Sequence, residues 1–218
     1  MRMSAVERRF SDDDRRRIAE AVREAEAGTS GEVMVVIADA SDDYAEAPWR
    51  AAFGLLGLVM LADLGYRHFA TFWWSWNADV VWLGVGAAGV VGYLVASWAP
   101  LRRALIGRER MALRVRRAAE AAFTTERVFE TRDRTGILIY LSLLEHQVLV
   151  LPDAGIAAKA PETAWASVVA TIVSGMKAGR PTDAVVTAVQ SCGDMLRAAG
   201  FTARPDDANE IPDSARVR

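Results

Sequence analysis

Three acidic side chains and one threonine flank predicted strands, where they could hold a divalent cation. Asp133 and Thr135 come just before the apolar run that starts at Gly136, Asp153 follows the next run, and Glu32 opens an earlier one. Carboxylate oxygens are preferred ligands of Ca²⁺ and Mg²⁺, and such a cation can assist phosphoryl hydrolysis. These four residues are therefore the candidate metal-binding or ligand-binding positions. The alternative is that acids at strand ends cap turns and stay solvated.

Other common catalytic and metal-binding patterns do not occur in the sequence. Cys192 is the single cysteine, so an intrachain disulfide or a thiolate cluster is impossible, and we expect it to pack between helices. His68 and His146 are far apart and predict no zinc pair. The sequence contains no G-x-S-x-G, Walker or H-E-x-x-H motif. No catalytic residue and no certain cofactor follow from these residues, although Ca²⁺ or Mg²⁺ would suit the acidic positions.

Three apolar runs predict the sheet that must position these acids. Residues 32–38 are largely β-branched and predict a buried strand. Residues 136–143 and 147–151 predict two further strands, which the short turn at Glu145 and His146 makes antiparallel neighbours. The long connection between the first and second strands allows a parallel, right-handed crossover. The expected sheet is therefore small and mixed.

Helical periodicity surrounds these strands. Ser11 is a suitable N-cap for a helix that ends near Gly28, with three aspartates complementing the dipole in its first turn. Apolar positions at helical spacing predict further helices over 108–123, 161–179 and 181–200. The predicted fold class is α/β, with a small mixed sheet sandwiched by helices.

Two strongly apolar segments interrupt this α/β pattern. From Val80 to Ala99 twenty residues carry no charge, which as a helix is long enough to cross about 30 Å of hydrocarbon. The segment 49–67 has twelve uncharged residues between Arg50 and Asp63, so it spans only if these charges lie near the interfaces. We expect a transmembrane hairpin in the lipid bilayer. A soluble helical hairpin buried under a partner is the alternative.

Small residues recur every four positions along the second apolar segment. Gly84, Ala88, Gly92 and Ala96 would form one face on which another helix can approach closely in lipid, including a helix of a membrane protein partner. The segment also contains a G-x-G-x-x-G pattern, but it has no polar turn and no βαβ unit around it. Helix packing is therefore favoured over dinucleotide binding.

Arginine asymmetry predicts the orientation of the hairpin. The loop between the two segments holds Arg67 alone, whereas seven arginines follow the second segment between residues 102 and 117. The positive-inside rule then places the downstream side in the cytoplasm, and a hairpin returns the upstream side to the same compartment. Aromatic residues within 69–76 would form a belt at the opposite interface. We expect a multi-pass protein of the cell (inner) membrane with both termini cytoplasmic.

Length and charge limit the domain organisation and the partners. The chain has 218 residues and a formal net charge of -2, which gives no reason to expect nucleic-acid binding. The charged N-terminus does not resemble a cleaved signal peptide. We divide the chain into the first part of an α/β domain at 1–46, the hairpin at 47–101, the second part of the domain at 102–203, and a polar tail at 204–218.

The sequence resembles the TPM domain family, named for thylakoid lumen phosphatase-like, photosystem-repair and receptor-modulator proteins. The matching stretches are TSGEVMVVIA at 29–38, AAEAAF leading into TRDRTGILIYLSLLEHQVLVLPDAGI within 118–156, the helix of Trp165, and NEIPD at 209–213. The resemblance is closest to a membrane-embedded bacterial branch, which carries a hydrophobic pair of segments between the first strand and the second helix.

This resemblance implies two kinds of function. Members of the family have been described as acid phosphatases and calcium binders, and others as accessory factors that assemble or maintain membrane complexes. Asp133 and Asp153 match the acidic positions of the family, whereas Thr135 stands where many soluble members have asparagine. The expected function is an accessory or binding module for a membrane protein complex. The alternative is a divalent-metal-dependent, acid phosphatase-like hydrolase.

Overall fold

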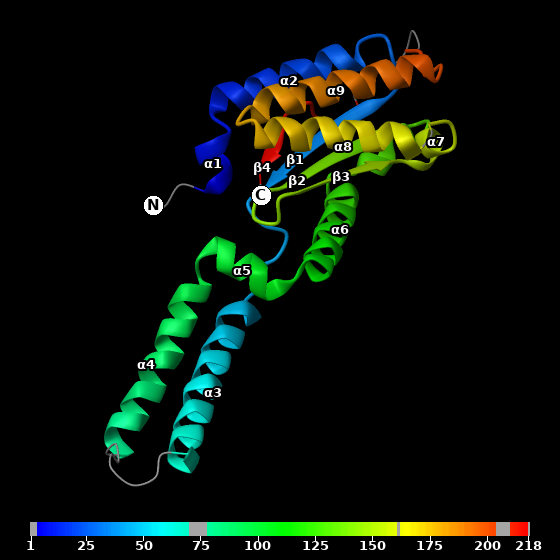
Figure 1. Ribbon diagram of the computed structural model, residues 1–218. Helices are drawn as coiled ribbons and strands as arrows, with labels where there is room; N and C mark the ends of the chain where they lie inside the picture. The colour runs from blue at the N-terminus through cyan, green and yellow to red at the C-terminus, as the bar shows by residue number, and fades with distance from the viewer. Residues whose placement is uncertain (1–3, 70–77, 161, 204–209, 218) are drawn as a thin grey trace. The chain divides into compact units, whose positions relative to one another are not determined.

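The structure is a computed structural model that describes residues 4–69, 78–160, 162–203 and 210–217 (Figure 1). The chain divides into two compact units, an α/β unit of residues 1–42 and 112–218 and a hairpin unit of residues 43–111. The hairpin unit thus continues past the expected boundary at residue 101, because a short helix after the second apolar segment packs against the hairpin. The expected aromatic belt at 69–76 lies outside the residues whose side chains are described.

Within the described residues, a mixed sheet of strand order β3-β2-β1-β4 forms the centre of the α/β unit. β1 (Glu32–Ala38) runs parallel to β2 (Gly136–Ser142), and β2 runs antiparallel to β3 (Gln147–Pro152). These pairings confirm the predicted small mixed sheet. The turn between β2 and β3 places His146 at a φ of 54°, in the left-handed region. β4 (Arg216–Val217) adds a short parallel edge beside β1.

Helices cover both faces of this sheet (Figure 1). Because side chains alternate along a strand, Val33 and Val35 of β1 face a core shared with α2, α8 and α9, whereas Met34 and Val36 face α6. Both faces are apolar, as expected for a strand buried on two sides. The helices of this unit are α1 (Ala5–Arg9), α2 (Asp12–Glu26), α6 (Arg108–Thr125, which begins in the hairpin unit), the 3-10 turn η1 (Val128–Glu130), α7 (Ala154–Ala157), α8 (Glu162–Lys177) and α9 (Pro181–Ala198).

The start of α2 shows how local sequence defines a helix. Ser11 accepts a hydrogen bond from the backbone N–H of Asp14 at 3.2 Å, and the Asp14 carboxylate accepts one from the Ser11 N–H at 2.9 Å. This reciprocal capping box confirms the predicted N-cap. Cys192 lies fully buried on α9, and burial raises the pKa of its thiol to about 12, which leaves it a packing residue.

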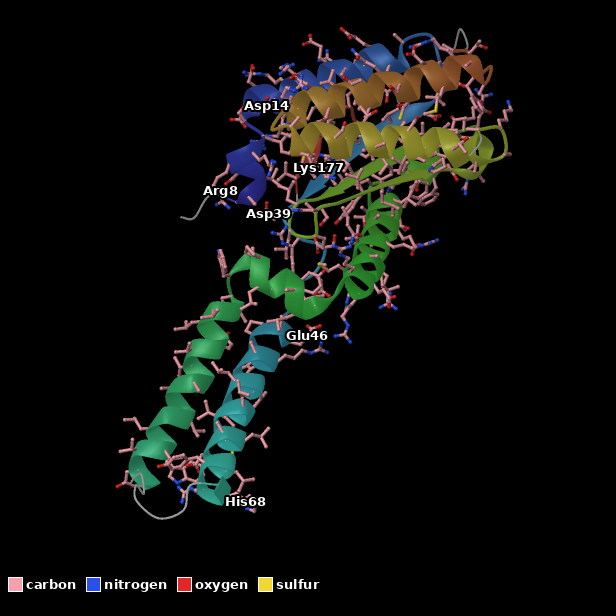
Figure 2. All side chains as sticks on the ribbon, viewed as in Figure 1. Arg8, Asp14, Asp39, Glu46, His68 and Lys177 are labelled. Carbon is pink, nitrogen blue, oxygen red and sulfur yellow. The ribbon has the colours of Figure 1, made fainter. Side chains whose placement is uncertain are left out.

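The two apolar segments form the helices of the hairpin unit, α3 (Glu46–Phe69) and α4 (Ala78–Ala96), followed by α5 (Ala99–Ile106). α3 and α4 lie side by side, and Glu46 and His68 mark the two ends of α3 (Figure 2). Both helices are long and apolar enough to cross a membrane by length and composition. The predicted interruption of the α/β fold by a helical pair is therefore present.

Residues 210–217 are integrated into the α/β unit, although the sequence suggests a polar tail from 204 onward. Ile211 is 3% exposed and packs into the core between the sheet and α6. Arg216 and Val217 then pair with β1. A single apolar residue among polar neighbours carries no periodic signal, so this docking could not be read from the local sequence.

Candidate functional site

The predicted acidic residues reach one edge of the sheet. Because Glu32 pairs with Gly136 across the parallel strands, β1 and β2 begin at the same edge, and the antiparallel β3 ends there. Asp133 and Thr135 precede β2 at this edge, and Asp153 follows β3. We call it the acidic edge. Its side chains have different surroundings, which decide what each can do.

A pocket of about 330 Å³ opens at the acidic edge beside Asp133. Ser30 lies on its lining, as do Lys159 and Phe201, and the Lys159 ammonium nitrogen lies 4.3 Å from the centre of the Phe201 ring. Gly155 also lines the pocket, and a β-carbon there would collide with the Asp133 carbonyl oxygen. An acidic, a basic and a hydroxyl-bearing residue therefore line this pocket, beside a point where two backbone segments pack closely.

Asp153 has a structural role. Its carboxylate accepts a hydrogen bond from the Ala154 N–H at 2.7 Å and so caps α7, and the Nε of Arg134 lies 3.0 Å from the other carboxylate oxygen. Asp153 is 4% exposed and lines a different pocket from Asp133, one formed between β3 and α6. The two aspartates that the sequence places together therefore line two separate pockets among the described residues.

Thr135 is fully committed to hydrogen bonds within the protein. Its hydroxyl donates to the Ser30 carbonyl at 2.6 Å, and its backbone N–H donates to the Thr131 hydroxyl at 2.8 Å. Only 1% of Thr135 is exposed. It joins the start of β2 to the loop before β1, so we assign it a positioning role rather than a ligand-binding one.

Glu32 faces a second carboxyl group that the sequence analysis missed, Glu26 at the end of α2. The Val33 N–H donates to Glu26 at 2.8 Å, and the Glu210 N–H donates to Glu32 at 3.4 Å. Burial is the main cause that raises the pKa of both Glu26 and Glu32, and the charge of Glu32 raises the pKa of Glu26 further. Glu26 follows Val22 by four residues and so lies on the apolar face of α2. A charged residue on that face was the signal in the sequence that Glu26 is buried.

The arrangement gives little support to a calcium or magnesium site. Among the described residues, no group of three or more His, Cys, Asp or Glu side chains is arranged to hold a metal ion. Asp133 and Asp153 line separate pockets, and Glu32 pairs with Glu26 instead of with them. In the described residues, the four predicted positions therefore do not form one cation-binding cluster.

The hairpin unit divides the predicted small-residue face in two. Gly92 packs against α3, since a β-carbon there would lie 2.8 Å from the Ala51 carbonyl oxygen, and Ala96 is fully buried. Ala88 is half-buried, whereas Gly84 is exposed and its β-carbon position has no atom within 4 Å. Gly92 and Ala96 therefore close the hairpin itself, and Gly84 faces outward.

The outer surface of the hairpin is apolar and uncovered in the described part of the chain. Only 11% of the most apolar stretch of α3 is buried, and only 22% of the corresponding stretch of α4. The large exposed apolar side chains of the two helices are Trp49, Phe53, Leu58, Met60, Leu61, Leu64, Tyr66, Val80, Trp82, Leu83, Val90, Val91, Tyr93, Leu94 and Val95.

Comparison with known proteins identifies a protein of similar fold but indicates no activity. The chain is similar to the NMR structure of the BA42 protein from the psychrophilic bacterium Bizionia argentinensis, with a TM-score of 0.59 and 17% sequence identity over 99% of this chain and 100% of that one. No family model and no curated protein matches the chain. At this identity the likeness concerns the fold alone.

Proposed function

We propose that this chain is an integral membrane protein in which α3 and α4 anchor a TPM-like α/β domain to the lipid bilayer. The domain then acts as an accessory or binding module for a membrane protein complex. The exposed apolar surface of the hairpin is the observation that supports this proposal. A core helix of a soluble protein hides its apolar side chains, whereas these two helices expose theirs around most of their circumference.

The energetics favour lipid as the surroundings of this surface. Five leucines of the two helices are between 62% and 76% exposed, and burying one such side chain gains about 1.5–3 kcal/mol. The charged residues of α3 fit this arrangement, because Asp63 and Arg67 form an ion pair of 2.8 Å near the end of the helix. A bilayer would cover the leucines and leave this pair close to an interface.

The proposed orientation in the cell (inner) membrane places both termini in the cytoplasm. Arginines are concentrated after α4, and Arg67 alone stands at the other end of the hairpin. The hairpin begins and ends on the same side, so one orientation fixes both ends of the α/β domain.

The acidic edge supports binding rather than phosphate hydrolysis. Asp133 and Lys159 line its pocket. Asp153, by contrast, forms an ion pair with Arg134 and caps α7. Metal-dependent hydrolysis needs a set of convergent carboxylates, which this edge does not offer in its described residues.

Membrane integration is tested by fractionating cells that express the full chain. We expect the protein to stay in the membrane pellet at alkaline pH and to be released only by detergent. A cysteine introduced after Asn77, in a Cys192→Ala background, should react with an impermeant maleimide added outside the inner membrane. Recovery of the chain in the soluble fraction without detergent would overturn the proposal, and labelling from the cytoplasmic side alone would reverse the orientation.

A chromogenic phosphate ester tests the alternative function. We expect the full chain in detergent to hydrolyse it no faster with Ca²⁺ or Mg²⁺ than without. Metal-dependent turnover that disappears in Asp133→Asn, with the fold intact, would instead establish the hydrolase.

A further inference from the structure

A pocket of about 190 Å³ lies at the edge of the sheet where β1 and β2 end and β3 begins, opposite the acidic edge. Residues of β2, β3 and α8 line it, together with Arg9 of α1. We propose that this pocket binds a small organic anion, namely a short aliphatic carboxylate whose chain enters the pocket and whose charge meets Arg9 and Lys177. The proposal does not rest on the membrane anchor, because every residue on this lining belongs to the α/β unit.

The inner surface of the pocket is apolar. Its apolar lining residues are Leu141, Leu143, Val148, Val173 and Met176. The two leucines are buried, whereas the valines and the methionine are partly exposed. Partly exposed apolar side chains gain free energy when another apolar group displaces the water on them. At about 30 Å³ for each water-sized group, the pocket holds roughly six such groups, so it fits a chain of about six carbons.

Arg9 and Lys177, the latter at the end of α8 (Figure 2), give this lining its charge. Both residues are exposed, so an anion in solvent can reach them. The Arg9 guanidinium donates a hydrogen bond to the Met176 carbonyl at 3.4 Å, which holds it beside the pocket. A carbonyl has no net charge, so this bond leaves the positive charge of Arg9 unneutralised. The guanidinium keeps further N–H groups for a carboxylate, which accepts two of them side by side.

Neighbouring acids do not neutralise these two cations. Among the described residues, neither Arg9 nor Lys177 forms an ion pair. Asp39 accepts a backbone N–H of α1 at 2.6 Å, and Glu145 accepts the Ser41 N–H at 2.8 Å. The other polar residues on the lining carry no negative charge: Ser142, His146 and Gln147. An apolar interior beside two cations is complementary to a carboxylate with a short apolar chain.

Methionine-methyl NMR of the full chain in dodecyl maltoside tests the site, with hexanoate as the probe. Met176 lines the pocket, Met34 is buried against α6, and Met60 is exposed on α3, where it reports entry of hexanoate into the detergent. We expect the Met176 signal, assigned with Met176→Leu, to shift and saturate while Met34 stays unchanged. A Met176 shift that only follows Met60 without saturating would overturn the proposal.

Two further probes separate the contribution of the charge from that of the chain. Hexanamide has the same chain without the charge and should bind about tenfold more weakly, since hydrogen bonds between charged groups are stronger. Butanoate is two methylenes shorter than hexanoate and should bind about fifteenfold more weakly. Equal affinities of hexanoate and hexanamide for the wild-type chain would contradict the proposal.

Arg9→Gln/Lys177→Gln removes both cations at exposed positions, so we expect the fold to be retained. This variant should bind hexanoate about tenfold more weakly and hexanamide with unchanged affinity. The matched control is Arg16→Gln/Arg116→Gln, which changes the net charge equally at exposed residues outside the pocket and should bind hexanoate like wild type. Equal weakening in the two double variants would show that net charge alone attracts the anion, and the site would then be disproved.

Discussion

Gly92 of α4 stands directly against the backbone of Ala51 in α3, so that a β-carbon on Gly92 would lie 2.8 Å from the Ala51 carbonyl oxygen. Side-chain carbons do not approach backbone atoms so closely, and any larger residue must push the two helices apart. Gly84, two turns earlier on α4, has open space at the same position. Two glycines of one apparent stripe therefore belong to different surfaces.

This difference predicts contrasting effects of the same substitution. We expect Gly92→Leu to destabilise the hairpin by about 1–3 kcal/mol, because overpacking forces the helices to separate. Gly84→Leu should leave hairpin stability almost unchanged. Thermal unfolding of the full chain in detergent, followed by helical circular dichroism, measures both. Equal losses in the two variants would show that α3 and α4 do not pack in this way.

The Glu26 and Glu32 pair predicts a pH dependence of stability. The folded pKa of each group lies above the ordinary glutamate value of 4.5, chiefly because of burial. Such a group stabilises the fold fully below its unfolded pKa and loses that contribution as pH rises toward its folded pKa. The free energy of unfolding of the α/β unit should therefore fall as pH rises from about 4.5 through neutrality.

Glu26→Gln tests this dependence, because glutamine keeps the acceptor for the Val33 N–H and carries no charge. The variant should match wild type near pH 5 and be more stable by on the order of 1 kcal/mol near pH 8. The free energy of unfolding at each pH is measured by urea unfolding, with hydrogen exchange in β1 as the probe of the α/β unit. Glu24→Gln, an exposed position on α2, is the control and should follow wild type at every pH. Parallel stability curves for Glu26→Gln and wild type would contradict the pairing.

Asp153 and Asp133 should differ in their contributions to stability. Asp153→Ala removes the cap of α7 and the partner of Arg134, so we expect a loss of about 1–2 kcal/mol and faster hydrogen exchange in α7. Asp133→Ala changes a side chain that lines an open pocket and should cost less. Hydrogen exchange with mass spectrometry resolves the two. The assignment fails if Asp133→Ala loosens α7 more than Asp153→Ala does.

The C-terminal segment should contribute to the stability of the α/β unit. Ile211 is 3% exposed in the core beside α6, so Ile211→Ala should lower the free energy of unfolding by about 2–5 kcal/mol. Val217 is 36% exposed, and Val217→Ala serves as the control with a change below about 1 kcal/mol. Limited proteolysis checks the result, since Ile211→Ala should expose sites before β4. An unchanged digestion pattern would mean that Ile211 is not docked.

The sequence by itself determined the elements that depend on neighbouring residues. The strand over 32–38, the antiparallel pair around His146, the Ser11 cap and the two long apolar helices all follow from periodicity, turn length and capping chemistry. These signals act within a few residues or along one helix, so a single chain is enough to reveal them. The edge of the sheet at which the acids gather followed from the parallel crossover.

Only the tertiary structure decided which of these acids and glycines are neighbours. It separated Asp133 from Asp153, paired Glu32 with Glu26, brought Ile211 into the core, and turned Gly92 toward Ala51 while leaving Gly84 outside. Each of these contacts joins residues whose separation and facing depend on how whole helices and strands pack. Local patterns place a side chain on an element, and the packing of that element decides what the side chain meets.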